Sequence, residues 1–221
     1  MIRIILLIKL FLLSPFLPVG DNPHSENSAI DSLYHECGVA PSLSYDIFRM
    51  AIIGMEKIDS LKNKKIITII DYSKPSAQER FYVIDLEKKT LLYKTLVAHG
   101  KNSGEYKAVN FSNARGSLKS SLGFFITAET YTGNQGYSLR LDGLEPGFND
   151  KARERAIVIH GADYVSKAVA NEYGRLGKSW GCPAVPLYLT RKIIDKISNG
   201  SCIFIYGNDP VYLKNSKMIN N

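Results

Sequence analysis

Residues 65–71 read Lys-Ile-Ile-Thr-Ile-Ile-Asp, a β-branched run that is typical of a buried strand. Similar runs follow at residues 81–86 and 90–98, and Glu87-Lys88-Lys89 between them has the character of a hairpin turn. Further strand candidates are residues 122–128, 137–141, 156–160 and 201–206. Strands therefore dominate, and helices do not alternate with them, which disfavours a doubly wound α/β fold. We predict a mainly β domain, either a β-sandwich or a partly open barrel.

Helical patterns are few. Apolar residues recur at helical spacing between residues 41 and 63, where Ser42 or Ser44 can cap, and this predicts an N-terminal helix. Short accessory helices are expected over residues 163–171 and 187–197. Residues 21–30 are polar and are expected to be loose.

The first 20 residues have the pattern of an export signal. Arg3 and Lys9 flank an apolar run that ends in a proline-containing stretch, and the alternative is an uncleaved membrane anchor. The expected organisation is a leader over residues 1–20, a polar segment with a helix over 21–63, and one β domain over 64–221. We expect an extracytoplasmic location, periplasmic or secreted, with membrane contact only through an uncleaved leader.

Composition narrows the classes of partner. The 221 residues are 45% hydrophobic and 22% charged, with a net charge of +7, which is ordinary for a globular domain. The basic excess is spread along the chain, which suits an acidic polymer such as a cell wall but also plain solubility. We expect no nucleic-acid partner. The scattered histidines and cysteines have no metal-ligand spacing, so no metal or other cofactor is expected.

Two residues offer nucleophilic chemistry. His160 closes an apolar run and precedes Gly161, whereas Cys182 follows Gly181 in a turn-like stretch. Cysteine chemistry needs a thiolate, and a neighbouring imidazole is a common means of forming one. Glycine permits a tight turn in which the N–H groups of Gly181 and Cys182 could point at one oxygen. We predict a cysteine nucleophile with a histidine base, against the alternatives of a buried structural thiol and a satisfied core histidine.

The remaining cysteines and histidines leave choices open. An odd cysteine count leaves at least one thiol unpaired in the monomer. Cys37 and Cys202 could form a disulfide, or Cys202 could be a small buried residue of the last strand. His99 also closes a strand-like run before a glycine, and we favour a structural or substrate-side role for it over that of the base.

The segment Ile159-His160-Gly161-Ala162, followed by Ser179-Trp180-Gly181-Cys182, resembles the catalytic signature of the murein L,D-transpeptidases, the YkuD-type domain family. Other stretches resemble the branch of that family called L,D-transpeptidase catalytic-domain-like proteins, namely residues 99–104, 111–113, 116–117, 120–123, 136–141, 143–145 and 156–185. The resemblance covers about residues 65–206.

The resemblance implies a β-rich enzyme outside the cytoplasm that acts on peptidoglycan stem peptides. Cys182 would attack the bond after the third residue of a stem tetrapeptide, and D-Ala would leave. The acyl group would pass to an amine of a neighbouring stem, or to water in an L,D-carboxypeptidase. His160 would be the base, with its second ring nitrogen bonded to a backbone carbonyl near Gly161. Ser179 and Gly181 map directly onto the signature.

The chain also departs from the common family pattern. Trp180 replaces a second histidine, and it could form a wall of the cleft or stack on a substrate. Pro183-Ala184 stands where an apolar residue and then Asn or Arg are usual, which leaves recognition of the donor carboxylate unassigned. Arg140 and Arg175 are candidates for that role, although each could be a solvated charge. Tyr137 is a candidate for an oxyanion contact, or else a packed strand aromatic.

Two other functions remain open. Sortases share the order of histidine before cysteine and have a later arginine, a role that Arg191 could take, although their histidine lies much further upstream. A non-catalytic module that binds the cell wall, with Cys182 inert or in a disulfide, is the other alternative.

Overall fold

A single strongly bent sheet forms the body of the protein, and the computed structural model describes it within residues 23–220. Its strands are β1 (Asn63–Asp71), β2 (Phe81–Asp85), β3 (Thr90–Thr95), β4 (Gly123–Gly133), β5 (Gly136–Gly143), β6 (Val158–Ala162), β7 (Ala184–Pro186) and β8 (Ser201–Tyr206). They lie in the order β3-β2-β1-β8-β4-β5-β6-β7. The pairs β1–β8 and β6–β7 are parallel, and the others are antiparallel.

The two ends of the sheet approach each other. Ala98, just beyond β3, forms an antiparallel bridge with Ala184 of β7. The Ala98 N–H donates to the Ala184 carbonyl at 2.8 Å, and the return bond measures 3.4 Å. This contact makes the sheet a nearly closed eight-stranded barrel, which confirms the prediction of a mainly β, partly open barrel.

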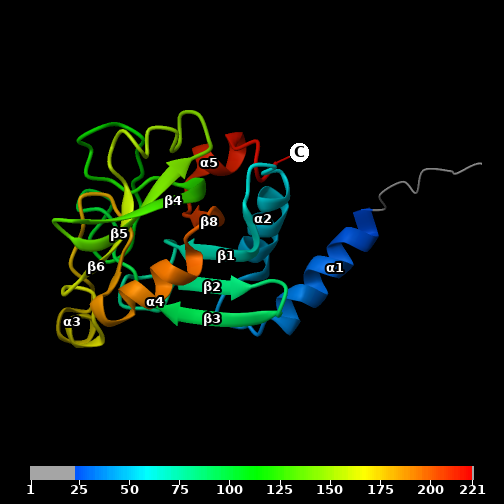
Figure 1. Cartoon of the computed structure of the whole chain (residues 1–221), viewed down its shortest axis with the longest axis horizontal. Coiled ribbons are helices and arrows are strands. Elements are labelled where there is room, and N and C mark those ends of the chain that lie inside the picture. The colour runs from blue at the N-terminus through cyan, green and yellow to red at the C-terminus, as the bar shows by residue number, and fades with distance from the viewer. Residues whose placement is uncertain (1–22, 221) are drawn as a thin grey trace, which may run out of the picture.

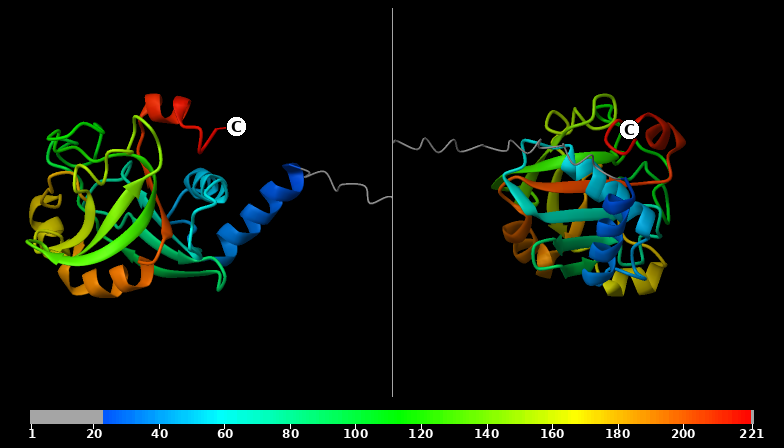
Figure 2. Two further views of the ribbon diagram at one scale, coloured as in Figure 1. Left: turned by 45° about the horizontal axis from the view of Figure 1, so that its top comes forward. Right: turned by 90° about the vertical axis from the view of Figure 1, so that its right-hand side faces the viewer.

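Five helices accompany the sheet in the described residues: α1 (Pro23–Glu36), α2 (Tyr45–Glu56), α3 (Lys167–Tyr173), α4 (Leu187–Ile197) and α5 (Pro210–Asn215). Figure 1 shows α1 projecting from one end of the molecule and α3 lying at the other. Figure 2 shows α2 lying close against the sheet while α1 slants away from it. Within the described part of the chain, none of the helices combines the length and the apolar character needed to cross a bilayer.

The core lies between the sheet and the helices that cover it. Strand β8 is central, with five of its six residues buried, and α2 contributes Phe48, Ala51 and Ile52. The rings of Phe124 and Phe204 stack at a centroid distance of 4.4 Å. This packing places β8 and β4 under α2 and leaves β5, β6 and β7 to form the end of the barrel where the candidate site lies.

The predicted elements agree with the structure where side-chain periodicity is strong. Residues 187–197 and 201–206 have the predicted bounds, and Ser44 caps α2 by accepting from the Ile47 N–H. The expectation of a loose segment over residues 21–30 is wrong, because α1 begins at Pro23. The predicted leader over residues 1–20 lies outside the described residues.

Candidate active site

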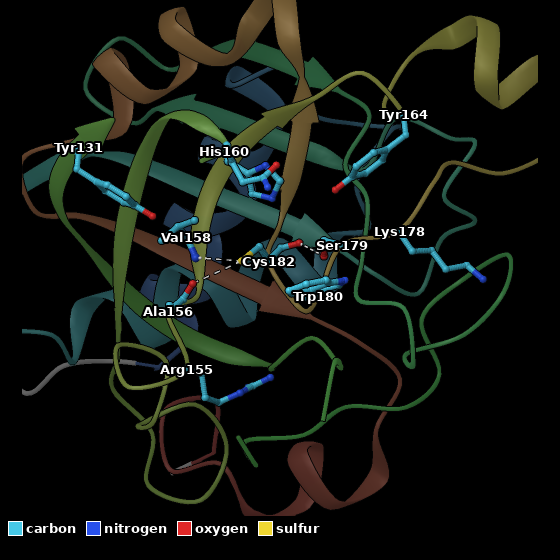
Figure 3. A pocket seen from close by; sticks show the side chains of 11 residues that line it. Tyr131, Arg155, Ala156, Val158, His160, Tyr164, Lys178, Ser179, Trp180 and Cys182 are labelled. Atoms are coloured by element: carbon cyan, nitrogen blue, oxygen red, sulfur yellow. Dashed lines mark hydrogen bonds between the residues drawn. The ribbon is translucent and has the colours of Figure 1, made fainter. Parts of the chain in front are cut away.

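A cavity of about 440 Å³ opens at the end of the barrel away from α1. It contains both residues that the sequence singled out, His160 and Cys182 (Figure 3). The other residues that line it are Tyr131, Gln135, Arg155, Ala156, Val158, Tyr164, Lys178, Ser179 and Trp180.

Ser179 and Gly181 shape the turn that presents Cys182. The Ser179 hydroxyl donates to the Cys182 carbonyl at 2.6 Å and accepts from the Gly181 N–H at 3.1 Å. Gly181 has a φ of +123°, and a side chain there would come within 2.8 Å of the Lys119 carbonyl, so glycine is required. The prediction that the N–H groups of Gly181 and Cys182 point at one oxygen is wrong for Gly181, because its N–H already donates to the Ser179 hydroxyl.

The turn is held from behind by the segment that follows β3. The Ser179 N–H donates to the His99 carbonyl at 3.1 Å, and the Lys101 N–H donates to the Ser179 carbonyl at 2.8 Å. The Ser120 hydroxyl accepts from the Gly100 N–H and donates to the Gly181 carbonyl. These contacts fix the backbone on both sides of the cysteine turn.

The Cys182 sulfur rests on the backbone that leads into β6. It accepts from the Val158 N–H at 3.5 Å, and the thiol donates to the Ala156 carbonyl at 3.7 Å (Figure 3). Burial raises the pKa of the Cys182 thiol, and the Val158 N–H and the positive charge of Arg155 lower it in part. The resting side chain is therefore a thiol.

His160 is buried, with 4% of its surface exposed, and it is held in one orientation. Its Nδ1 lies 3.0 Å from the Gly161 carbonyl, as the resemblance implies. Because a carbonyl only accepts, Nδ1 carries the proton and Nε2 is the basic nitrogen. Burial lowers the pKa of His160, so this imidazole stays neutral at lower pH than a free imidazole does. A side chain on Gly161 would come within 2.2 Å of the Thr190 hydroxyl, which requires glycine beside this histidine.

Strand pairing brings His160 and Cys182 to the same cavity. His160 on β6 is in register with Ala184 on β7, two residues after the cysteine, and the His160 N–H donates to the Pro183 carbonyl at 3.4 Å. Among the described residues, the hydrogen bonds of the sulfur go to Ala156 and Val158, and none joins it to the imidazole.

Trp180 lies at the mouth of the cavity with 78% of its surface exposed. Figure 3 shows its indole beside Ser179 and Cys182, whereas Tyr131 and Tyr164 stand on opposite sides of His160. A large apolar ring left in solvent next to a cavity marks a surface suited to a ligand. Trp180 therefore lies in the lining of the cavity, at its mouth.

The three predicted substrate-binding residues do not line the cavity. The Tyr137 hydroxyl donates to Asp195 at 2.8 Å, and its ring lies under the guanidinium of Arg191 at 4.4 Å. Arg140 pairs with Glu129 at 3.1 Å and packs over the Tyr131 ring, and Arg175 pairs with Glu105 at 2.8 Å. A carboxylate engages each of the three residues, and Arg191, which lies over the Tyr137 ring, is also outside the cavity lining.

His99 has a structural place. Its Nδ1 accepts from Arg80 at 2.8 Å, and its Nε2 donates to the Gly104 carbonyl at 3.0 Å. Burial, followed by the Arg80 charge, lowers the pKa of His99 to about 4. It lies outside the cavity lining. Its backbone carbonyl, and not its ring, binds the cysteine turn by accepting from the Ser179 N–H.

The choice left open for the other cysteines is resolved in favour of free thiols. Cys37 and Cys202 are buried and unpaired, with 2% and 0% of their surfaces exposed. Burial raises the pKa of Cys37 to about 11 and that of Cys202 further. Cys182 is the free cysteine that lines the cavity.

Tyr131, Arg155, Tyr164 and Lys178 line the cavity, although the sequence did not predict a place for them in the site. No local signal separates Arg155 from Arg153, two residues earlier, which faces outward and binds Glu129 and Asp142. The difference appears only in the folded chain, where Arg155 binds the loop of residues 112–121 and lines the cavity.

Solved structures of several L,D-transpeptidases are similar to this chain. An L,D-transpeptidase from Mycobacterium smegmatis is 13% identical over 65% of this chain and 59% of its own, with a TM-score of 0.41. The corresponding enzyme from Stackebrandtia nassauensis is 13% identical over 83% of this chain and 78% of its own, at 0.40. The helical cell shape determining protein Pgp2 from Campylobacter jejuni is 14% identical over 73% and 57%, at 0.46.

The chain thus spans 59% of the length of the first of these proteins. Because the TM-scores are below 0.5, these likenesses carry no argument of their own. No curated protein matches the chain. A sequence model of the family described as L,D-transpeptidase catalytic domain matches residues 39–206, which include every strand and the whole cavity lining. Because that match covers well over half of the sequence, the chain belongs to the L,D-transpeptidase catalytic domain family.

Proposed function

We propose that this protein is a cysteine-dependent enzyme of the peptidoglycan, an L,D-transpeptidase or an L,D-carboxypeptidase, with Cys182 as nucleophile and His160 as base. The observation that carries the proposal is that one cavity contains both side chains, with the proton of His160 fixed on Nδ1 by Gly161. Cys37 and Cys202 are buried away from this cavity.

In the proposed reaction, the Cys182 proton passes to Nε2 of His160, and the sulfur bonds to the acyl carbon of the donor. The negative charge that develops on the acyl oxygen needs a hydrogen-bond donor, and the N–H of Cys182 is the candidate that the turn leaves without an acceptor among the described residues. The imidazolium then returns its proton to the leaving amine of D-Ala. An amine or water attacks the thioester and releases the sulfur.

The cavity also suits an anionic donor. Within the described part of the chain, its lining includes no carboxylate, and it includes Arg155, a cation that no acidic side chain pairs; its other cation, Lys178, is bound to Glu105. A stem peptide has free carboxylates, so this charge favours its binding. The exposed ring of Trp180 adds an apolar surface at the entrance. We extend the proposal to an extracytoplasmic location, where peptidoglycan is accessible.

An acylation experiment tests the proposal. The full chain is incubated with a carbapenem and its intact mass is measured. We expect one adduct on the native protein and on Cys37→Ala, a control that removes a buried thiol, and none on Cys182→Ala. The absence of an adduct on the native protein, or an equal adduct on Cys182→Ala, would contradict the nucleophile assignment.

The substrate is tested separately. A diaminopimelate-containing stem tetrapeptide is supplied with and without an amine acceptor, and D-Ala release is followed by mass spectrometry. A cross-linked product identifies a transpeptidase, and a tripeptide alone identifies a carboxypeptidase. If the carbapenem adduct forms but the tetrapeptide stays intact, the peptidoglycan assignment fails while the nucleophile stands.

A further inference from the structure

The guanidinium of Arg155 is fixed beside the cysteine turn. Its Nη1 donates to the Ser112 carbonyl at 2.7 Å and to the Ser121 hydroxyl. Its Nη2 donates to the Lys119 carbonyl at 2.7 Å and to the Ser117 hydroxyl at 3.3 Å. Four bonds to one loop hold the side chain in a single position at the edge of the cavity (Figure 3).

All four acceptors of Arg155 are neutral. Among the described residues, no carboxylate pairs with it, whereas Arg140, Arg153 and Arg175 each bind an acidic side chain. Arg155 is also partly buried. A partly buried charge without a counter-ion is costly, and its field extends to neighbouring groups because little water screens it.

The charge also lies close to the turn that carries Cys182. A Cβ atom on Gly181 would lie 3.4 Å from Nη2 of Arg155, an ordinary van der Waals distance, so the guanidinium lies against this turn. The sulfur of Cys182 contacts Ala156 and Val158, which immediately follow the arginine. Arg155 therefore belongs to the same short segment of chain that the Cys182 sulfur contacts.

Other ionisable side chains near Cys182 supply less positive charge. Burial raises the pKa of Tyr72 and of Tyr164 to about 12, so both rings are neutral near pH 7. Burial lowers the pKa of His160, which is neutral there as well. The ammonium of Lys178 is bound to an acidic residue at the rim.

We propose that Arg155 is a positioning residue whose fixed positive charge favours the thiolate of Cys182 over the thiol. The inference deepens the proposed function, since it concerns the same nucleophile, but it needs no peptidoglycan activity to be true. A nearby positive charge stabilises an anion relative to its protonated form and so lowers the pKa of a thiol. Burial lowers the pKa of Arg155, and the interaction with Cys182 offsets part of that lowering.

The test measures how the alkylation of Cys182 by iodoacetamide depends on pH in the full chain. The thiolate displaces iodide and forms a thioether, so the rate follows the thiolate fraction. We expect Arg155→Met and Arg155→Gln to raise the midpoint by about one pH unit, which lowers the rate about tenfold below the midpoint. Arg155→Lys keeps a charge and should keep most of the effect.

Two controls separate charge from loop anchoring. Ser121→Ala removes one loop contact of Arg155 and leaves its charge, and Lys178→Met removes a cavity cation that is already neutralised. Both should keep the native midpoint. An unchanged midpoint in Arg155→Gln, or an equal shift in Ser121→Ala, would overturn the inference. If the midpoint shifts and the tetrapeptide remains intact, the charge effect stands and the proposed function fails.

Discussion

At the scale of single residues, the site depends on how backbone groups engage each reactive side chain. Gly161 fixes the His160 proton, Ser179 occupies the Gly181 N–H, and Val158 supports the Cys182 sulfur. Gly161 and Ser179 belong to the two segments around His160 and Cys182, and Val158 lies on the same strand as His160. The orientation of the reactive groups therefore needs no third acidic side chain.

The titration of His160 gives a prediction at this scale. A buried imidazole resists protonation, so its pKa lies below the ordinary value of 6.5, and it can accept a proton at lower pH than a free imidazole. The rate of Cys182 acylation by a carbapenem should rise with pH through a midpoint below about 6.5.

The matched variant is His160→Gln, which should slow acylation by at least about 100-fold and abolish this midpoint. Rates measured between pH 4 and pH 9 check both results. A midpoint above 6.5 in the native protein, or a glutamine variant that reacts at the native rate, would exclude His160 as the base.

At the scale of elements, the position of α2 depends on a small residue. Gly54 lies where a side chain would come within 2.1 Å of the Phe124 ring on β4. The ring of Phe124 in turn stacks on Phe204 of β8, so it has little room to move. The helix therefore packs closely on the sheet only because this position has no side chain.

We therefore predict that Gly54→Ala destabilises the protein. In an unconstrained helix this change would stabilise by roughly 0.5–1 kcal/mol, because alanine loses less entropy. Overpacking against Phe124 should outweigh that gain, and we expect a net loss of about 1–2 kcal/mol in the free energy of unfolding. Urea denaturation measures it, and a higher midpoint than that of the native protein would contradict the close contact.

The sequence predicted elements best where periodicity is strong. Residues 187–197 form α4 because Ile193 and Ile197 face the sheet, and the bounds agree with the prediction. Strand β7 was missed because it has three residues, one of them proline, and it depends on pairing with β6. Helix α5 was also missed, although Asp209 before Pro210 is a recognisable start signal.

At the scale of the whole molecule, the fold separates one accessible thiol from two inaccessible ones. Cys37 is buried in the core directly after α1, and Cys202 lies in the central strand β8, whereas Cys182 lines the cavity. A thiol reagent can reach Cys37 and Cys202 only when the core opens. Their reaction with a thiol reagent therefore reports global or subglobal opening.

Thiol titration should count one fast-reacting group per native chain and three in denaturant. The native count should fall to zero in Cys182→Ala, which identifies the fast thiol. Ellman's reagent, with and without urea, provides the measurement. Two or more fast thiols in the native protein would contradict the burial of Cys37 and Cys202.

The sequence by itself determined the strand-rich class, the candidate residues His160 and Cys182 that share the cavity, and the glycines beside them, because these depend on local periodicity and backbone chemistry. Only the tertiary structure decided which other side chains share the cavity. Arg155 enters it, while Arg140 and Arg175 bind carboxylates elsewhere. The physical reason is that a side chain reaches the cavity through the order of the strands and through contacts with segments distant in sequence, such as the loop of residues 112–121 that holds Arg155, and neither is encoded in a short stretch of sequence.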